Sequence, residues 1–333
     1  MRDGELTMVV YEGWEDEEAS QPVREQGIAV RPTYVDNDSD LIDAMRAGVG
    51  EVDLICIDNR FTRIGIEERL LVPFDVTRIP ATGELLARFG ELITFFGDTW
   101  SVPYVWGTCP LSYNAALVDS PPRSVLELAH PEYDGRVVIR DEPYNQIVVF
   151  ARALGHDNPL RMTRAELDDV VRAVVDLKER THAPVLALRD LYELLISGER
   201  PLATGAGWEG VTVVARRRGS DVRSYHPRDG DHAWVDAWCL LRDAPNPDAA
   251  YAWVDYMTRA EPQRIVCDKL PCGTVNRHAA ERVSDEVKQL FPTDDVAGLF
   301  GRPTDVDLPP LHADGDVATF ADWQAAWERV RGE

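Results

Sequence analysis

The stretch SDLIDAMRAGVGEVDLICID, residues 39–58, predicts a capped amphipathic helix followed by a strand. Two further strands are predicted on its N-terminal side, LTMVVY at residues 6–11 and IAVRPTYV at residues 28–35. Residues 16–27 between them form a polar helix or a loop. Strand, helix, strand, helix, strand in this order predicts a parallel sheet with helices on its faces.

Acidic and aromatic residues follow each of the three strands. The segments are YEGWEDEE at residues 11–18, YVDND at residues 34–38 and IDNRF at residues 57–61. Ligands of open α/β sheets bind at the carboxyl ends of the strands. We therefore expect a rim of the sheet at which carboxylates and aromatic rings gather.

A second α/β unit is predicted from residue 124 onward. It begins with a helix at residues 124–133, a strand at 136–141 and a helix at 142–155. A chain of 333 residues exceeds what one hydrophobic core usually serves, so two lobes are expected. Further helices are predicted at residues 163–181, 188–197, 246–268, 285–291 and 321–331, and a further strand at residues 201–207.

The charge balance restricts the class of partner. Asp and Glu outnumber Lys and Arg by 58 to 35, which gives a formal net charge of -23. This balance argues against nucleic acid or an anionic membrane surface as a partner and would attract a cationic small molecule. A solvated acidic surface is the simpler source of the total charge.

The remaining composition gives two further expectations. No run of 18 apolar residues is present, and the first residues lack the apolar region of a signal peptide, so the protein is either cytoplasmic or a mature form. The five cysteines form no CxxC pair, and buried free thiols are the default interpretation. Only Cys267 and Cys272 are close enough in sequence for a disulfide in a small loop.

The stretch VPYVWGTCPLSYN, residues 102–114, places aromatic residues and a glycine inside an apolar strand. Together with the opening that ends in VDLICID and the run SGERPLATGAGWEGVTVVA at residues 197–215, it resembles the extracellular solute-binding proteins of ABC importers. The resemblance is to their spermidine/putrescine-binding branch, and it extends over nearly the whole chain.

The resemblance implies a type II periplasmic-binding-protein fold, with two α/β lobes, a ligand cleft and hinge-crossing strands. In this fold VPYVWGT would be the first segment of the chain to line the cleft before the chain crosses to the other lobe. Gly107 would allow close backbone approach there, and Tyr104 and Trp106 would support the hinge. Lobe 1 would comprise residues 1–112 plus 237–282, and lobe 2 residues 113–236 plus 283–333.

The resemblance also implies a function. The protein would be a non-enzymatic substrate-binding protein that binds a polyamine and delivers it to an ABC permease in the membrane. We expect a monomer without a cofactor or a metal, in the periplasm or anchored to the outer face of the membrane, with its signal peptide removed.

Positions that hold the ligand in the family can be transferred residue by residue. A polyamine needs carboxylates for its ammonium groups and aromatic faces for its methylenes. The family's tryptophan after the first strand matches Trp14, with Glu15 and Asp16 beside it. Taken singly these residues are ordinary core and rim residues, but their joint placement after strand ends favours a ligand role. The remaining matches are Glu142 in IRDEPYN, Trp208 in the W-x-G segment, and Trp234 and Asp236 in the W-x-D loop.

The chain also departs from the family pattern. A further acid of the family is Asn145 here, an aromatic position is Cys272, and the segment after the third strand carries Asp58 and Arg60 in place of hydroxyl and tyrosine residues. A guanidinium that faced the ligand would repel a polyamine and attract a carboxylate or phosphonate. A zwitterion such as a 4-aminobutyrate-like amino acid would then be the alternative ligand, with its amine held by Asp236 and Glu142.

Arg60 has other roles open to it. It could pair with Asp58 or Asp53, or point to solvent from the start of a helix.

Other kinds of site are less well supported by the sequence. The loop HPRDGDH at residues 226–232 contains two histidines and two aspartates but lacks the usual spacing of a zinc site. No motif of a catalytic nucleophile and no dinucleotide fingerprint is present. A cytoplasmic sensor or an enzyme on the same fold is the third hypothesis.

Overall fold

A computed structural model describes residues 4–205, 208–294 and 296–332. Residues 206 and 207, in the GAG part of the run at 197–215, lie outside the described residues. None of the helices described there is both long and apolar enough to cross a membrane.

The chain divides into two compact units, each built from two segments. Unit 1 comprises Met1–Gly107 and Trp234–Phe300, and unit 2 comprises Thr108–Ala233 and Gly301–Glu333. The lobe bounds expected from the sequence make the chain pass from one lobe to the other after residues 112, 236 and 282. In the structure the chain passes between the units after residues 107, 233 and 300.

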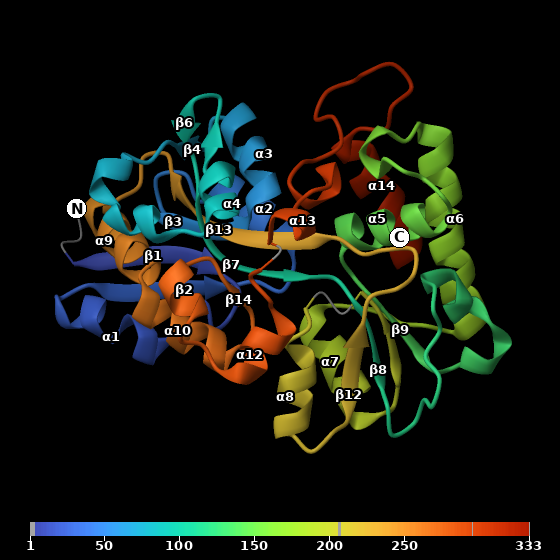
Figure 1. Cartoon of the computed structure of the whole chain (residues 1–333). Coiled ribbons are helices and arrows are strands. Elements are labelled where there is room, and N and C mark those ends of the chain that lie inside the picture. The colour runs from blue at the N-terminus through green and yellow to red at the C-terminus, as the bar shows by residue number, and fades with distance from the viewer. Residues whose placement is uncertain (1–3, 206–207, 295, 333) are drawn as a thin grey trace. The chain divides into compact units, whose positions relative to one another are not determined.

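The sheet of unit 1 begins with the three parallel strands predicted from the sequence (Figure 1). They are β1 (Glu5–Val10), β2 (Ala29–Tyr34) and β3 (Leu54–Asp58), and β1 lies between the other two. The strand order is β14-β7-β13-β3-β1-β2, so strands from later in the chain extend the sheet beyond β3. These later strands are β7 (Val102–Thr108), β13 (Ala233–Leu241) and β14 (Gly273–Thr274). The short strand β4 (Leu71–Val72) also pairs with β13. A separate two-stranded sheet is formed by β5 (Thr94–Phe95) and β6 (Asp98–Thr99).

Helices cover this sheet. The polar segment after β1 is the helix α1 (Glu17–Glu25), and the capped segment before β3 is α2 (Asp38–Ala47). The predicted helical pair is α9 (Pro247–Met257) and α10 (Ala260–Lys269), which pack with α1 (Figure 1). The short helices of unit 1 are α3 (Thr62–Glu67), α4 (Ala87–Leu92), α11 (Arg277–Ala280), α12 (Asp285–Leu290) and α13 (Val296–Leu299).

Aromatic packing explains why residues 283–300 belong to unit 1. Phe291 and Phe300 contact the ring of Trp106 on β7, with ring centroids 5.7 and 6.0 Å away. The indole of Trp106 also donates a hydrogen bond of 3.0 Å to the carbonyl oxygen of Thr274. Because Trp106 is buried in unit 1, the segment that covers it folds onto the same unit.

Unit 2 has its own mixed sheet, in the order β10-β9-β11-β8-β12. The strand β9 is parallel to its neighbours β10 and β11, whereas β8 is antiparallel to β11 and β12. The carboxyl ends of β9 and β11 therefore lie at the same edge. The bounds are β8 (Leu111–Asn114), β9 (Val137–Arg140), β10 (Val185–Leu186), β11 (Leu202–Thr204) and β12 (Val222–Tyr225).

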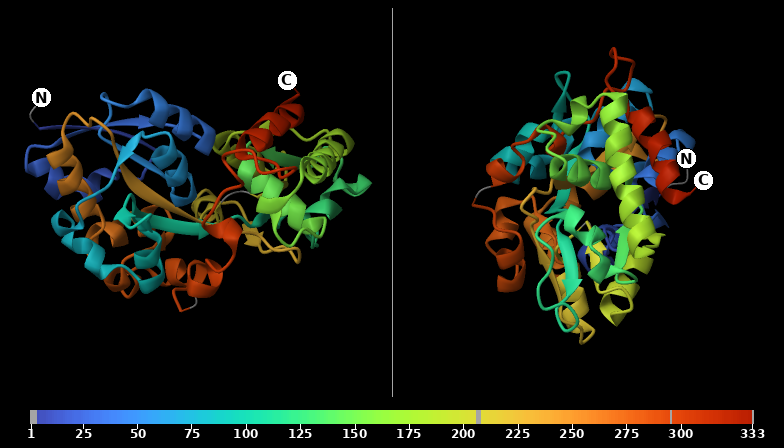
Figure 2. Two further views of the ribbon diagram at one scale, coloured as in Figure 1. Left: turned by 90° about the horizontal axis from the view of Figure 1, so that it is seen from above. Right: turned by 90° about the vertical axis from the view of Figure 1, so that its right-hand side faces the viewer.

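Three helices of unit 2 lie side by side (Figure 2). They are α5 (Pro143–Ala153), α6 (Arg164–Thr181) and α14 (Phe320–Arg331), and all three were predicted. The segment 124–133, however, was predicted as one helix and forms two short 3-10 turns, at Val125–Ala129 and Pro131–Tyr133. The proline excludes a helical conformation from the residue before it, which breaks the segment at His130.

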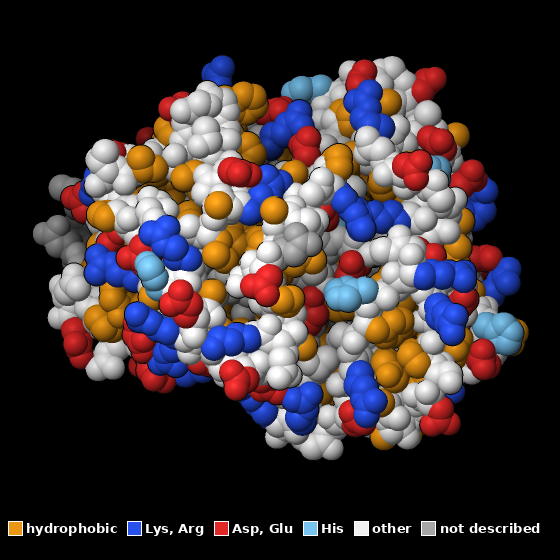
Figure 3. Space-filling view, viewed as in Figure 1, with side chains coloured by type: hydrophobic (Ala, Val, Ile, Leu, Met, Phe, Trp, Pro, Cys, Tyr) orange, Lys and Arg blue, Asp and Glu red, His pale blue; other side chains and the backbone are white. Residues whose placement is uncertain are grey.

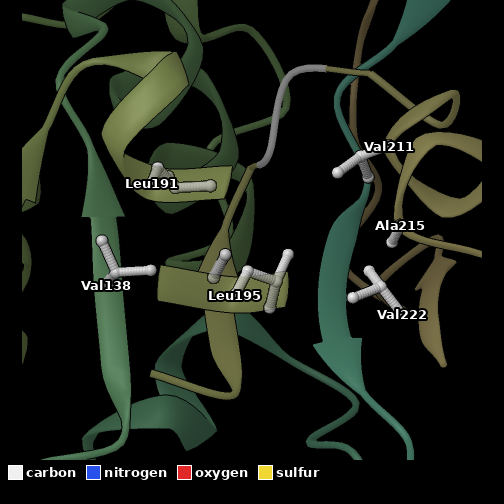
Figure 4. Packing of buried hydrophobic residues seen from close by; sticks show 7 residues of the cluster. Val138, Leu191, Leu195, Val211, Ala215 and Val222 are labelled. Carbon is white, nitrogen blue, oxygen red and sulfur yellow. The ribbon is translucent and has the colours of Figure 1, made fainter. Parts of the chain in front are cut away.

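A hydrophobic cluster packs the strands of unit 2 against the helices α7 (Leu188–Ser197) and α8 (Val211–Arg217). Leu191 and Leu195 of α7 belong to this cluster together with Val138 of β9, and so do Val211 and Ala215 of α8 with Val222 of β12 (Figure 4). The ring of Trp208 packs against the margin of this cluster.

Charged side chains of both signs lie on the surface, and the cysteines are buried. On the face shown in Figure 3, acidic and basic side chains lie interspersed rather than in large areas of one sign. The five cysteines are buried free thiols, and the sulfur atoms of Cys267 and Cys272 are 3.6 Å apart.

Candidate functional site

One edge of the unit 1 sheet gathers the side chains that the sequence singled out. The strands β1, β2 and β3 run parallel and end at this edge, and β13 runs antiparallel to β3 and starts there. The register pairs Asp236 of β13 with Asp58 of β3, so two carboxylates lie on neighbouring strands. Trp14, in the turn after β1, reaches the same edge.

Trp14 is held from two sides. Its indole Nε1 donates a hydrogen bond of 2.8 Å to the Oδ2 atom of Asp236, across 222 positions of sequence. Its backbone carbonyl accepts a hydrogen bond of 2.8 Å from the hydroxyl of Tyr104 on β7, and the two rings meet edge to face. The aromatic residue of the crossing strand therefore fixes the tryptophan that orients Asp236.

Asp236 is a buried carboxylate in a negative environment. Only 4% of the residue is exposed, and burial raises its pKa well above the ordinary value, assisted by the charges of Asp58 and Asp38. The bond from Trp14 and the charge of Arg60 act in the opposite direction. Since burial without a compensating cation disfavours the ionised form, a cationic group that reached Asp236 would be strongly bound.

Arg60 pairs with Asp58, which is one of the roles left open by the sequence. Its Nε lies 2.8 Å from Oδ1 and its Nη2 lies 2.7 Å from Oδ2, so the pair is bidentate. Both side chains are buried. Asp53 instead accepts hydrogen bonds from Thr7 and Asn246.

Glu15 and Asp16 make local structural contacts. Glu15 accepts hydrogen bonds from the hydroxyl of Tyr34 at 2.5 Å and from the backbone of Gly13, and the former raises the pKa of Tyr34 to about 12. Asp16 caps the N-terminus of α1 and lies 3.0 Å from the ammonium of Lys269. These contacts support the loop around Trp14.

Trp234 lies two residues before Asp236 on β13, and its ring covers Gly107. A Cβ atom at position 107 would lie 2.6 Å from Cζ2 of Trp234, which is closer than real Cβ contacts. The glycine that interrupts VPYVWGT is therefore required for the indole to pack where it does.

Glu142 and Trp208 belong to unit 2 and follow β9 and β11, whose carboxyl ends lie at one edge. Glu142 is buried and lies 3.8 Å from a guanidinium nitrogen of Arg140. The ring of Trp208 contacts that of Tyr192 on α7, with centroids 6.1 Å apart.

The sequence interpretation did not assign two further acids to a ligand role. Asp38, after β2, accepts a hydrogen bond of 2.9 Å from Tyr11 and adds to the field at Asp236. Glu209, directly after Trp208, is buried and accepts hydrogen bonds from Thr108. Both follow predicted strands, so the rule that found Trp14 could have found them.

In the loop at residues 226–232, His226 contacts Asp231 and His232 contacts Asn145. Within the described ranges, no group of three His, Cys, Asp or Glu side chains is arranged to hold a metal ion.

The chain is similar to several proteins of known class. It is 26% identical over 201 residues to the spermidine/putrescine-binding periplasmic protein of Escherichia coli, which covers 59% of this chain and 56% of that protein. It is 25% identical over 323 residues to the putrescine-binding periplasmic protein PotF of Escherichia coli, covering 88% of this chain and 85% of that protein. The chain thus matches little more than half of the length of the first relative and most of the second.

The fold is shared with the Tp0655 (TpPotD) lipoprotein of Treponema pallidum, with a TM-score of 0.80 at 18% identity, over 99% of this chain and all of that one (100%). This likeness and the strand order of unit 1 confirm the predicted type II periplasmic-binding-protein fold. The family model that describes bacterial extracellular solute-binding proteins matches residues 23–293 of this chain. The chain belongs to the family of bacterial extracellular solute-binding proteins.

Proposed function

We propose that this protein binds a polyamine such as putrescine or spermidine and presents it to an ABC permease, outside the cytoplasmic membrane and without catalysing a reaction. The names of its relatives suggest this ligand class. The observation that carries the proposal is the buried carboxylate of Asp236, oriented by Trp14 and surrounded by further acids.

A diamine would supply the positive charge that this edge of unit 1 lacks. An ammonium group that contacts Asp236 would supply the missing positive charge, and the faces of Trp14 and Trp234 would cover methylenes or a second cation. Asp58 and Arg60 neutralise each other and add little net charge. The buried carboxylate of Asp236 therefore favours a cation over a zwitterion.

The alternative ligand is a 4-aminobutyrate-like zwitterion whose carboxylate would contact Arg60, and a phosphonate would bind the same way. The bidentate bond of Arg60 to Asp58 opposes this alternative, because a ligand carboxylate would have to compete with a buried, well-aligned partner.

Tryptophan fluorescence tests the proposal. Putrescine and 4-aminobutyrate have the same four-carbon chain and differ only at one end, so they form a matched pair of ligands. We expect a saturable change in emission with putrescine or spermidine and none with 4-aminobutyrate at equal concentration. A response to 4-aminobutyrate alone would instead assign Arg60 to a ligand carboxylate, and no response to any of the three would refute the amine site.

A further inference from the structure

Glu209 is a buried acid in unit 2 that the family resemblance does not assign to the ligand. Only 6% of the residue is exposed. Its carboxylate accepts a hydrogen bond of 3.1 Å from the backbone N–H of Thr108 and a second bond from the hydroxyl of the same residue. It directly follows Trp208, one of the predicted ligand residues, so it stands at the edge where β11 ends.

The buried carboxylates of Glu142 and Glu209 differ in whether a cationic side chain compensates their charge. Glu142 has the guanidinium of Arg140 within 3.8 Å. Among the described residues no arginine, lysine or histidine forms an ion pair with Glu209, whose carboxylate accepts its hydrogen bonds from the two donors of Thr108. Because burial without a cation disfavours the ionised carboxylate, an ammonium group that reached Glu209 would be stabilised there, by the same reasoning as for Asp236.

The loop before β13 brings an acid and a histidine into the field of Glu209, and the charge of Glu209 contributes to raising the pKa of His226. Asp231, in this loop, repels Glu209, and His226 of the same loop is paired with Asp231 at 2.7 Å. Tyr192 of α7 lies nearby, and Arg140 acts on that tyrosine. Burial is the main reason that the pKa of Glu209 is raised to about 7, and the bonds from Thr108 limit the rise.

We propose that Glu209 is the carboxylate through which unit 2 binds an ammonium group of the ligand, and that binding there releases a proton. The inference rests on the proposed function and deepens it, because it names the acid and couples affinity to pH. The proton leaves the carboxyl group of Glu209 for the solvent, the ligand amine stays protonated, and no other bond changes.

Calorimetry with putrescine measures this release. Titrations in two buffers of different ionisation enthalpy give the number of protons released per ligand. If Glu209 is fully ionised in the complex, its share is about 0.9 proton at pH 6, about 0.5 at pH 7 and close to zero at pH 8.5. Asp236 also has a raised pKa, so the share of Glu209 is the difference between the wild type and a Glu209→Gln variant.

Glu209→Gln keeps the shape of the side chain and removes the charge. We expect affinity for putrescine to fall about ten- to hundredfold at pH 8.5, where the wild-type carboxylate is ionised, and by less at pH 6. Glu199→Gln, an exposed change in the same unit, is the matched control and should alter neither affinity nor proton release.

A second variant keeps the test independent of how well Glu209→Gln folds. Thr108→Val retains the shape of Thr108 but removes the hydroxyl bond that lowers the pKa of Glu209, so the midpoint of proton release should move above pH 7. Unchanged affinity and proton release in Glu209→Gln, or an unchanged midpoint in Thr108→Val, overturns the inference while the proposed function stands. A wild-type protein that binds no diamine overturns both.

Discussion

Replacement of Asp236 by asparagine separates function from stability at one position. The substitution keeps the size of the side chain and an oxygen that can accept the hydrogen bond from Trp14, which is 2.8 Å long in the wild type. It removes only the negative charge, so its effects report on that charge.

Ligand affinity and thermal stability should change in opposite directions. A charge-assisted contact with an ammonium contributes about 1.5–3 kcal/mol, so the dissociation constant for putrescine should rise about ten- to more than a hundredfold. The pKa of Asp236 in the folded protein is raised above its unfolded value. The ionised carboxylate therefore destabilises the ligand-free protein, and this cost grows as pH rises above the unfolded pKa. We expect Asp236→Asn to have a higher Tm than the wild type at pH 7 to 8 and a similar Tm near pH 4.

Two assays and one control check this reasoning. Calorimetry with putrescine gives the affinity, and circular dichroism melts between pH 4 and 8 give the stability. Asp98→Asn, at the exposed hairpin of β5 and β6, should change neither quantity. An unchanged affinity together with a lower Tm would show that Asp236 is a structural acid whose charge the fold requires, and the amine site in unit 1 would be refuted.

Three other predictions follow from contacts in unit 1. Gly107→Ala places a Cβ atom 2.6 Å from the ring of Trp234, so the free energy of unfolding should fall by about 1–3 kcal/mol with a shift in tryptophan emission, and unchanged urea melts would contradict the packing. Arg60→Met leaves the buried Asp58 without its partner and should cost about 3–5 kcal/mol in urea unfolding; adding Asp58→Asn should recover most of this, and no recovery would argue against the pair. The sulfur atoms of Cys267 and Cys272 are 3.6 Å apart, so refolding with oxidised glutathione should lower the thiol count in denaturant from five to three, and five remaining thiols would exclude the disulfide.

Much of the fold could be predicted because its signals are local. The hydrophobic periodicity of the segments that form β1, α2 and β3 predicted the parallel sheet. The bounds of the helix Leu188–Ser197 were predicted to the residue. The differences from the sequence expectations have one distant and one local cause. Residues 283–300 joined unit 1 because they cover Trp106, and segment 124–133 broke at a proline within a predicted helix.

The sequence by itself determined which residue types follow the strand ends, and hence that Trp14 and Asp58 share one edge of a sheet. The tertiary structure added Asp236 to that edge by pairing β13 with β3. Only the tertiary structure decided which carboxylates lack a cation. Asp58 and Glu142 have guanidinium groups within reach, whereas Asp236 is bonded to an indole 222 positions away and Glu209 to Thr108 across 101 positions. The charge state of a carboxylate depends on burial and on the groups that the fold brings beside it, and neither can be read from the order of residues along the chain.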